Sequence, residues 1–307
     1  MSRTTEIELT GLTGSSPIGA LAAFGLLRLC AEIEVLSQTK LGWRRRDDWF
    51  AVLSLSGDIN KEALVALLSE HLRKQPTDVF EWHQDGRELP NAYKTLLRSA
   101  VESASWDQRR KCDFFAAFAS EMAVDSTDKE LIKPTAFYMT SARQQFLSTA
   151  QKLAKAYRKD QPEKLNEALF GPWLYRDQQH ALGWDPAAER IHALRYMEPS
   201  KDKKNRSVNF AIRLALEALP LFPVFPDKNG RLSTSGFVRI KRENVFQWPL
   251  WQAPISLDVL KTLLTSELGD DKNLCRRGVN ALYKSIRSEF GQGYGIFRPA
   301  QLVWQKH

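Results

Sequence analysis

Apolar residues alternate or recur with a helical period through the first third of the chain. From Glu6 to Thr10 polar and apolar residues alternate, which predicts a strand with one buried face. A loop rich in glycine and serine follows, and an apolar run over 17–34 predicts a helix that is buried nearly all round. A second strand is predicted over 49–56 and an amphipathic helix over 61–74. The N-terminal part is therefore expected to be α+β.

The rest of the chain carries mostly helical periodicity. Helices are predicted over 91–104, 107–122, 140–159 and 208–219, with two more after residue 256. A strand is predicted over 235–241, and irregular structure over 170–195. The polar segment 124–133 is the expected boundary between an N-terminal α+β domain (1–123) and a mainly helical domain (134–307), unless both form one continuous domain. The predicted fold class is α+β, predominantly helical, with a small mixed or antiparallel sheet.

Charge adds a preference for polyanions to this picture. The 307 residues include 44 Lys and Arg against 36 Asp and Glu, a net charge of +8, which attracts nucleic acid. The three cysteines are scattered singly, which favours a reducing compartment and argues against a zinc ribbon. Neither a signal peptide nor an unbroken apolar stretch of membrane-spanning length is recognisable. A cytoplasmic protein without a membrane partner is expected.

Basic and amide side chains gather in short segments as candidates for contacts with nucleic acid. The loop at 14–16 precedes a predicted helix, whose first N–H groups favour an anion, although a plain strand-to-helix turn explains it as well. The helix predicted over 140–159 opens with residue types that read guanine and adenine, and it continues with a lysine-rich face that solvation alone also explains. The full candidate set is Gly14, Ser15, Ser16, Arg44, Arg45, Arg46, Arg143, Gln144, Gln145, Lys152, Lys155, Arg158, Lys159, Lys201, Lys203, Lys204, Arg206, Arg239 and Lys241.

One cluster of residues has the types that ligate metals. His180, Asp185, Glu189 and His192 lie within one segment, and the last two have the i, i+3 spacing that places them on one helix face. No second Glu-x-x-His accompanies them, and the chain has five histidines in all. We therefore expect no catalytic residue, no metal and no cofactor.

Aromatic residues are the remaining candidates for binding. Trp173, Trp184, Trp248, Trp251 and Phe237 lie near basic or polar residues of the second half. Aromatic rings can stack on unpaired bases, but packing in the core is their commoner role. We interpret each of the five as a core or contact residue first.

Several segments together resemble one family. They are Leu9-Thr-Gly-Leu-Thr-Gly-Ser-Ser-Pro-Ile-Gly-Ala-Leu-Ala-Ala-Phe-Gly-Leu-Leu-Arg28, Phe137-Tyr-Met-Thr-Ser-Ala-Arg-Gln-Gln-Phe146, Leu169-Phe-Gly-Pro-Trp173, Gly183-Trp-Asp-Pro-Ala-Ala-Glu-Arg-Ile-His-Ala-Leu-Arg195, Ala218-Leu-Pro-Leu-Phe-Pro223, Thr234-Ser-Gly-Phe237 and Trp248-Pro-Leu-Trp251. Segments of this kind are similar to those of large-subunit-like proteins of type I-U (also called I-G) CRISPR systems. The resemblance touches much of residues 7–30 and 137–252.

The resemblance implies a non-catalytic subunit of an RNA-guided surveillance complex in antiviral defence. Its implied partners are guide RNA, target DNA, the backbone and guide-end-capping subunits, and a recruited helicase-nuclease. In such complexes base pairing with the guide reads the sequence while protein subunits hold the strands. The chain is short for a large subunit, so large, small and accessory roles remain open. Two rival interpretations are a guide-RNA-processing or DNA-cleaving nuclease and a purely structural adaptor.

Overall fold

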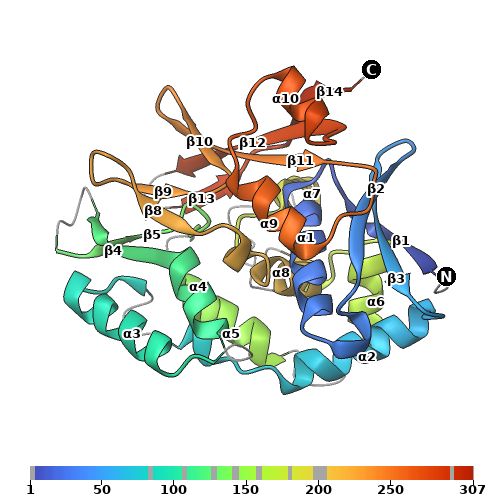
Figure 1. Cartoon of the computed structure of the whole chain (residues 1–307), viewed down its shortest axis with the longest axis horizontal. Helices are drawn as coiled ribbons and strands as arrows, with labels where there is room; N and C mark the ends of the chain where they lie inside the picture. Colours follow the sequence, from blue (N-terminus) through green and yellow to red (C-terminus); the bar gives the residue numbers. More distant parts are fainter. Residues whose placement is uncertain are drawn as a thin grey trace.

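The computed structural model describes residues 4–81, 86–105, 109–125, 130–139, 145–156, 161–178, 182–195, 206–290 and 294–306. Helix α1 (Pro17–Ala31) forms the centre of the molecule. It packs against the N-terminal sheet on one side and against helix α8 (Asn209–Leu216) on another (Figure 1). Gly25 allows this approach, because a Cβ at that position would overlap the carbonyl oxygen of Leu214 in α8.

The N-terminal sheet is antiparallel and has the strand order β1 (Thr4–Thr13), β3 (Trp49–Ser56), β2 (Lys40–Arg45). Strand β1 leads into α1 through a tight turn, where Ser16 accepts a hydrogen bond from the backbone N–H of Gly19 and Pro17 occupies the first helical position. The predicted strand at 49–56 and the predicted buried helix from Pro17 are both confirmed.

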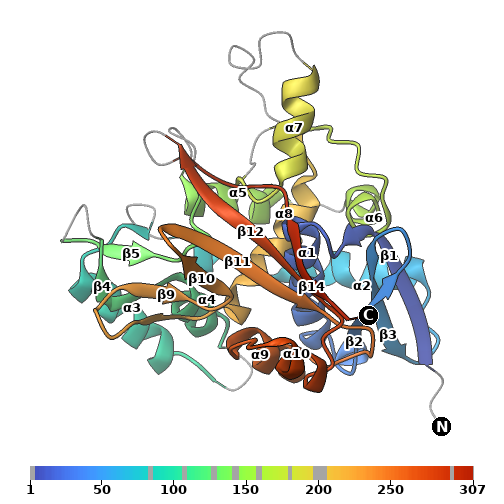
Figure 2. The same cartoon turned by 90° about the horizontal axis from the view of Figure 1, so that it is seen from above.

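Helices of the middle part cover the lower side of α1 and α8 in Figure 1. They are α2 (Lys61–Lys74), α3 (Pro90–Glu102), α4 (Arg110–Phe118), α5 (Phe146–Ala156) and α6 (Pro162–Phe170). Helix α7 (Pro186–Arg195) lies apart from them and projects from the edge of the molecule in Figure 2. Helix α2 has the predicted bounds and buries Leu64, Leu68 and Leu72 on one stripe. None of the described helices is long and apolar enough to cross a membrane.

The C-terminal part is built mainly of strands. A five-stranded antiparallel sheet has the order β10 (Phe237–Ile240), β11 (Glu243–Leu250), β12 (Ala281–Phe290), β13 (Tyr294–Phe297), with β14 (Gln301–Gln305) also paired to β12. Figure 2 views this sheet from its outer side. Its inner side packs Phe246 and Phe297 against Phe137. Helices α9 (Leu257–Thr265) and α10 (Asp271–Arg276) connect β11 to β12.

Three short strand pairs complete the architecture. They are β4 (Ala119–Val124) with β5 (Ile132–Pro134), β6 (Asp177–Gln178) with β7 (Arg206–Ser207), and β8 (Val224–Pro226) with β9 (Leu232–Thr234). All three pairs are antiparallel. The hairpin formed by β8 and β9 directly precedes β10 in the chain.

The predicted fold class is wrong in its emphasis on helices. In the described part of the chain 42% of the residues are helical and 28% lie in strands, so the protein is a mixed α+β structure with several antiparallel sheets. The error comes largely from the C-terminal part, where only helices were predicted after residue 256. Apolar residues at Ala281, Leu282, Ile286 and Phe290 fit a helical period, but this segment pairs on both edges as β12.

Two further differences concern the middle of the chain. The helix predicted over 107–122 ends at Phe118, and Ala119 begins β4. The polar segment 124–133, predicted as a domain boundary, connects β4 to β5 within one hairpin. Contacts such as the hydrogen bond from Trp248 Nε1 to the Gly14 carbonyl, 2.8 Å, join the two predicted domains. The division at 1–123 and 134–307 stays a prediction.

Candidate nucleic-acid interface

Two consecutive hairpins project from one edge of the molecule. Strand β9 runs from the tip of the first hairpin to its base, and after Ser235 and Gly236 strand β10 runs outward again. The two tips therefore lie on the same side of the base that joins them. Figures 1 and 2 both show the hairpins β8–β9 and β10–β11 extending in the same direction.

Five exposed cations lie on these hairpins. The β8–β9 hairpin contributes Lys228 and Arg231, and the β10–β11 hairpin contributes Arg239, Lys241 and Arg242. None of the five forms an ion pair with any acidic residue that the structure describes. The same segments hold the acids Asp227 and Glu243. Asp227 is engaged in its own turn, where its Oδ1 accepts from the backbone N–H groups of Asn229 (2.8 Å) and Arg231 (2.9 Å). These hairpins carry a net positive charge that is not neutralised locally.

The turn of the second hairpin has an unfavourable backbone conformation. Ile240 pairs with Glu243, so Lys241 and Arg242 form a two-residue connection. Lys241 has φ of 57°, in the left-handed region that costs a residue with a Cβ about 1–2 kcal/mol. Glycine is free of that cost, so a glycine at this position would relieve the backbone while removing the charge.

The candidate residues Arg44, Arg45 and Arg46, at the end of β2 and directly after it, have a different environment. Arg44 pairs with Glu8 (2.9 Å) and with Glu6 (2.6 Å) on β1, and Arg46 pairs with the same Glu8 (3.0 Å). The guanidinium of Arg45 lies 6.0 Å from the ring of Trp49. Two carboxylates thus neutralise two of the three predicted phosphate ligands.

The loop Gly14-Ser15-Ser16 is engaged within the protein. The N–H of Gly14 donates to the Trp49 carbonyl (2.7 Å), and Ser15 Oγ donates to Asp48 Oδ2 (2.5 Å). A Cβ at Gly14 would lie 2.6 Å from the Leu250 side chain, so no open space adjoins the turn on that side. The carboxylate of Asp48 beside the start of α1 disfavours a bound phosphate. The geometry favours a structural turn.

The candidates in the middle of the chain are only partly described. Gln145 precedes α5 and accepts a hydrogen bond from the N–H of Thr149 at its carbonyl, which places it before the helix rather than inside the first turn. Lys152 is exposed on α5, and Lys155 pairs with Glu81 at 3.3 Å. Arg206 lies on β7, half-buried. Arg143, Gln144, Arg158, Lys159, Lys201, Lys203 and Lys204 lie outside the described residues.

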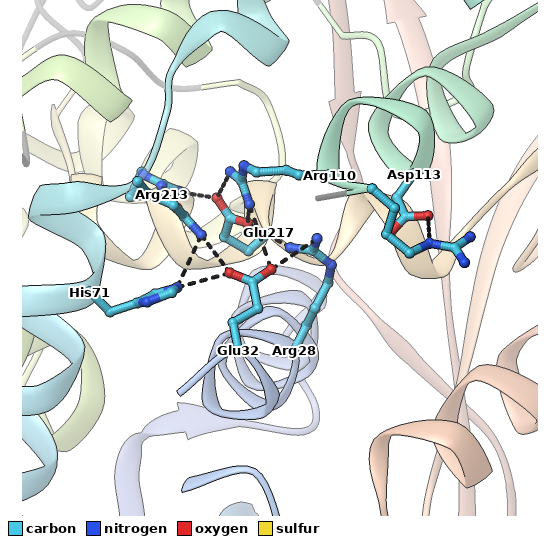
Figure 3. Close-up of polar contacts among 9 residues, drawn as sticks. Arg28, Glu32, His71, Arg110, Asp113, Arg213 and Glu217 are labelled. Carbon is cyan, nitrogen blue, oxygen red and sulfur yellow. Dashed lines mark hydrogen bonds and ion pairs between the residues drawn. The ribbon is translucent and has the colours of Figure 1, made fainter. Parts of the chain in front are cut away.

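A buried cluster of charges joins four helices, and Figure 3 shows it around Glu217. Glu217, the residue that follows α8, is fully buried and accepts from Arg110 at both carboxylate oxygens (2.6 Å each), from Arg28 (2.9 Å) and from Arg213. Glu32, at the end of α1, accepts from Arg28 (3.1 Å), from His71 (2.8 Å) and from Gln75 (2.9 Å). Three guanidinium groups thus share two carboxylates.

The charges of this cluster set its protonation. Burial alone would raise the pKa of the Glu217 carboxyl, but the guanidinium groups of Arg110, Arg213 and Arg28 outweigh burial and hold that pKa well below its usual value. Burial likewise opposes ionisation of Glu32, and hydrogen bonding to His71 together with Arg28 lowers its pKa. Both acids are therefore ionised at neutral pH, and the cluster holds α1, α2, α4 and α8 together as a structural element.

The candidate metal cluster is only partly described. His180 and the side chains of Glu189 and His192 lie outside the described residues. Asp185 is buried, and its Oδ1 accepts a hydrogen bond from the N–H of Ala187 near the start of α7. The pKa of the Tyr175 hydroxyl is raised by burial and by its hydrogen bond to Asp185. Among the described residues no group of His, Cys, Asp and Glu has the geometry of a metal site.

The aromatic residues named from the sequence serve mainly as core. Trp184, Trp248 and Trp251 are almost completely buried, and each indole N–H donates to a backbone carbonyl. Phe237 packs edge-on against Phe137 with ring centroids 4.9 Å apart, and Trp173 is half-buried. These rings stabilise the interior, as the sequence interpretation favoured, and their faces are not open to a base.

A surface groove of about 570 Å³ between α2 and α6 has the opposite electrostatic character. It is lined by Glu62, Glu70 and Glu163 with Arg73 as its single basic residue. Acidic walls repel phosphate, so this groove does not suit nucleic acid.

Comparison with known proteins gives no match: no family model matches the sequence, and no curated protein matches it.

Sequence reasoning identified Arg239 and Lys241 but missed Lys228, Arg231 and Arg242, which lie on the same two hairpins. A signal was present: Asp227-Lys-Asn-Gly230 has the composition of a turn and stands between two short apolar runs. A predicted hairpin there would have placed Lys228 and Arg231 at its tip.

Proposed function

We propose that the protein is a non-catalytic nucleic-acid-binding subunit of an RNA-guided antiviral complex. One observation carries the binding part: five exposed cations without a carboxylate partner in the described structure, grouped on the adjacent hairpins β8–β9 and β10–β11. Unpaired Lys and Arg at one edge attract the phosphate backbone, because each contact releases condensed counterions. The resemblance to type I-U (I-G) CRISPR large-subunit-like proteins supplies the complex, with guide RNA, target DNA and the other effector subunits as partners.

Further features support this proposal. The described acid of the candidate metal cluster, Asp185, is engaged with the backbone and Tyr175, which favours a binding role over cleavage. Cys30, Cys112 and Cys275 are free thiols, which suits the cytoplasm.

The test compares two pairs of charge reversals. The double variant Lys241→Glu/Arg242→Glu removes cations from the proposed interface. Its matched control, Lys94→Glu/Arg98→Glu, removes two exposed cations of α3 and lowers the net charge equally. Affinity for labelled DNA and RNA is measured by fluorescence anisotropy over a range of salt concentrations.

The hairpin variant is expected to bind more weakly, and the slope of log affinity against log salt should fall by about 0.7–0.9 for each phosphate that the variant no longer neutralises. The α3 variant should keep the wild-type slope. Equal reductions in both variants would mean that only the overall charge matters. An absence of binding by the wild-type protein, together with retained association with other effector subunits, would favour the adaptor instead.

A further inference from the structure

Phe225 is the single aromatic residue of the described chain with an exposed side chain. Its relative exposure is 52%, whereas every other described Phe, Tyr and Trp side chain is buried or half-buried. It makes no ring contact with another described aromatic residue. The exposed ring of Phe225 is therefore available to a flat apolar group from outside the chain.

The strand register places Phe225 beside a cation. Phe225 of β8 lies opposite Ser233 of β9. Two residues further along, Asp227 lies opposite Arg231, and its N–H donates to the Arg231 carbonyl at 2.7 Å. Residues directly opposite each other, and residues two apart along a strand, point to the same face. Phe225 and Arg231 are therefore diagonal neighbours on one face of the hairpin. The opposite face carries Val224, Pro226 and Thr234, which are half-buried or buried.

The second hairpin adds to this surface. Val238 and Ile240 of β10 are 40% and 42% exposed, and Lys241 and Arg242 follow them directly. The second hairpin thus presents exposed apolar side chains on β10 and cations at its turn.

This arrangement matches the two surfaces of a single-stranded nucleic acid. An unpaired strand presents flat apolar bases together with anionic phosphates, and proteins hold it by stacking bases on aromatic rings while cations follow the backbone. A duplex hides the faces of its bases within the stack, so a ring on a hairpin finds only the phosphates there. Asp227 lies on the same face, and its carboxylate, which the turn holds beside Arg231, offsets part of the positive charge there.

We propose that the face of the β8–β9 hairpin formed by Phe225 and Arg231 binds single-stranded DNA or RNA, with one base stacked on Phe225 and phosphates held by Arg231 and by the cations at the tips of the two hairpins. This inference rests on the proposed function, because it names the form of nucleic acid that the same hairpins take. Stacking tolerates every base, so the site binds strands without preference for sequence.

The test uses the full chain with three variants at exposed positions. Phe225→Ala removes the ring, Phe225→Trp keeps an aromatic face and supplies a fluorophore, and Leu89→Ala removes an apolar side chain of similar exposure (54%) at the start of α3. Affinity is measured for a short single strand and for a duplex of the same sequence. Melting temperatures confirm that each variant is folded.

Phe225→Ala should weaken single-strand binding about 5- to 150-fold, the change that the removal of one stacking platform produces, while duplex binding and the salt slope stay unchanged. Phe225→Trp should retain single-strand affinity, and because the chain already has nine Trp, the single strand should quench this variant more than the wild type, while the duplex should quench both equally. Leu89→Ala should bind as the wild type does.

Equal weakening on both substrates, or no weakening on either, would overturn the stacking site while leaving the charge-based proposal intact. A wild-type protein that binds neither substrate would overturn both proposals.

Discussion

Arginines on β2 and cations on the β10–β11 hairpin are equally basic in the sequence but differ in the structure. Arg44 and Arg46 reach across to Glu6 and Glu8, at distances of 2.6–3.0 Å. Arg239, Lys241 and Arg242 meet no such acid among the described residues. The difference shows that a run of basic residues indicates nucleic-acid binding only where no neighbouring carboxylate pairs with it.

Strand alternation explains the neutralised region. Glu6 and Glu8 are two residues apart on β1. Val52 of β3 lies opposite Glu8 on one side and opposite Gly42 of β2 on the other, and Arg44 is two residues from Gly42. All of these positions share one face of the sheet. The long side chain of Arg44 reaches across β3 to both carboxylates. The hairpin at 237–250 has only Glu243 near its tip.

The largest effect is expected where paired charges are also buried. Glu217→Gln leaves Arg28, Arg110 and Arg213 without their shared anion, and the free energy of unfolding should fall by about 3–5 kcal/mol. Glu6→Gln, at an exposed pair, should lower it by about 1 kcal/mol at most. Urea denaturation at pH 7 measures both. Similar decreases in the two variants would contradict the structural role of the buried cluster.

Lowering the pH should reduce the free energy of unfolding through the same cluster in the unmutated protein. The folded-state pKa values of Glu217 and Glu32 lie below the ordinary value of 4.5, so the unfolded chain takes up protons first as the pH falls. The stability that these groups contribute is complete above pH 4.5 and is lost progressively below it. Urea denaturation between pH 7 and pH 3 should give a steeper decline for the wild type than for Glu217→Gln. Parallel curves would rule out the assigned pKa depression.

The hairpin tip should show a gain in stability at the cost of binding. Lys241→Gly relieves the left-handed backbone at φ 57° and should raise the free energy of unfolding by about 1 kcal/mol. It also removes a phosphate contact, so affinity for nucleic acid should fall. Lys228→Gly is the control that removes a cation without this relief, since Lys228 does not have a positive φ. Unchanged affinity in Lys241→Gly would make the tip a solvated turn.

The smallest effect is expected at the neutralised arginines. Arg44→Gln breaks two exposed ion pairs, which should cost about 1 kcal/mol or less. Affinity for nucleic acid and its salt slope should remain at the wild-type values, because this guanidinium is already paired. Anisotropy titrations measure both. A lower salt slope in the variant would mean that Arg44 contacts nucleic acid after all.

The N-terminal elements were predicted well because their apolar patterns are unambiguous. The strand at 49–56 and the helix at 61–74 have the predicted bounds, and α1 begins at the predicted Pro17. The start of each helix was predictable because a capping residue precedes it: Asn60 caps α2, and Ser16 caps α1.

The candidate site was harder to predict because pairing between distant segments decides it. The strand β2 was not predicted, so the match between its arginines and the acids of β1 was invisible. Likewise Phe225 lies between Pro223 and Pro226 in the sequence. Only the pairing of β8 with β9 shows that its side chain points to the exposed face of the hairpin and not to the buried face. Charge and composition can be read from the pattern of residues, while the choice between core and surface for single residues required the tertiary structure.

The cluster at Glu217 also bears on how the chain is made. Arg28 and Glu217 are 189 residues apart, and at about 5–20 residues per second a ribosome needs roughly 10–40 s to add that length. During this interval the apolar helix α1 has emerged while α8, which covers it, does not yet exist. For many seconds the nascent chain therefore presents an apolar segment that α8 does not yet cover. A chaperone that binds apolar segments should therefore raise the yield of folded protein by covering α1 until α8 has been made.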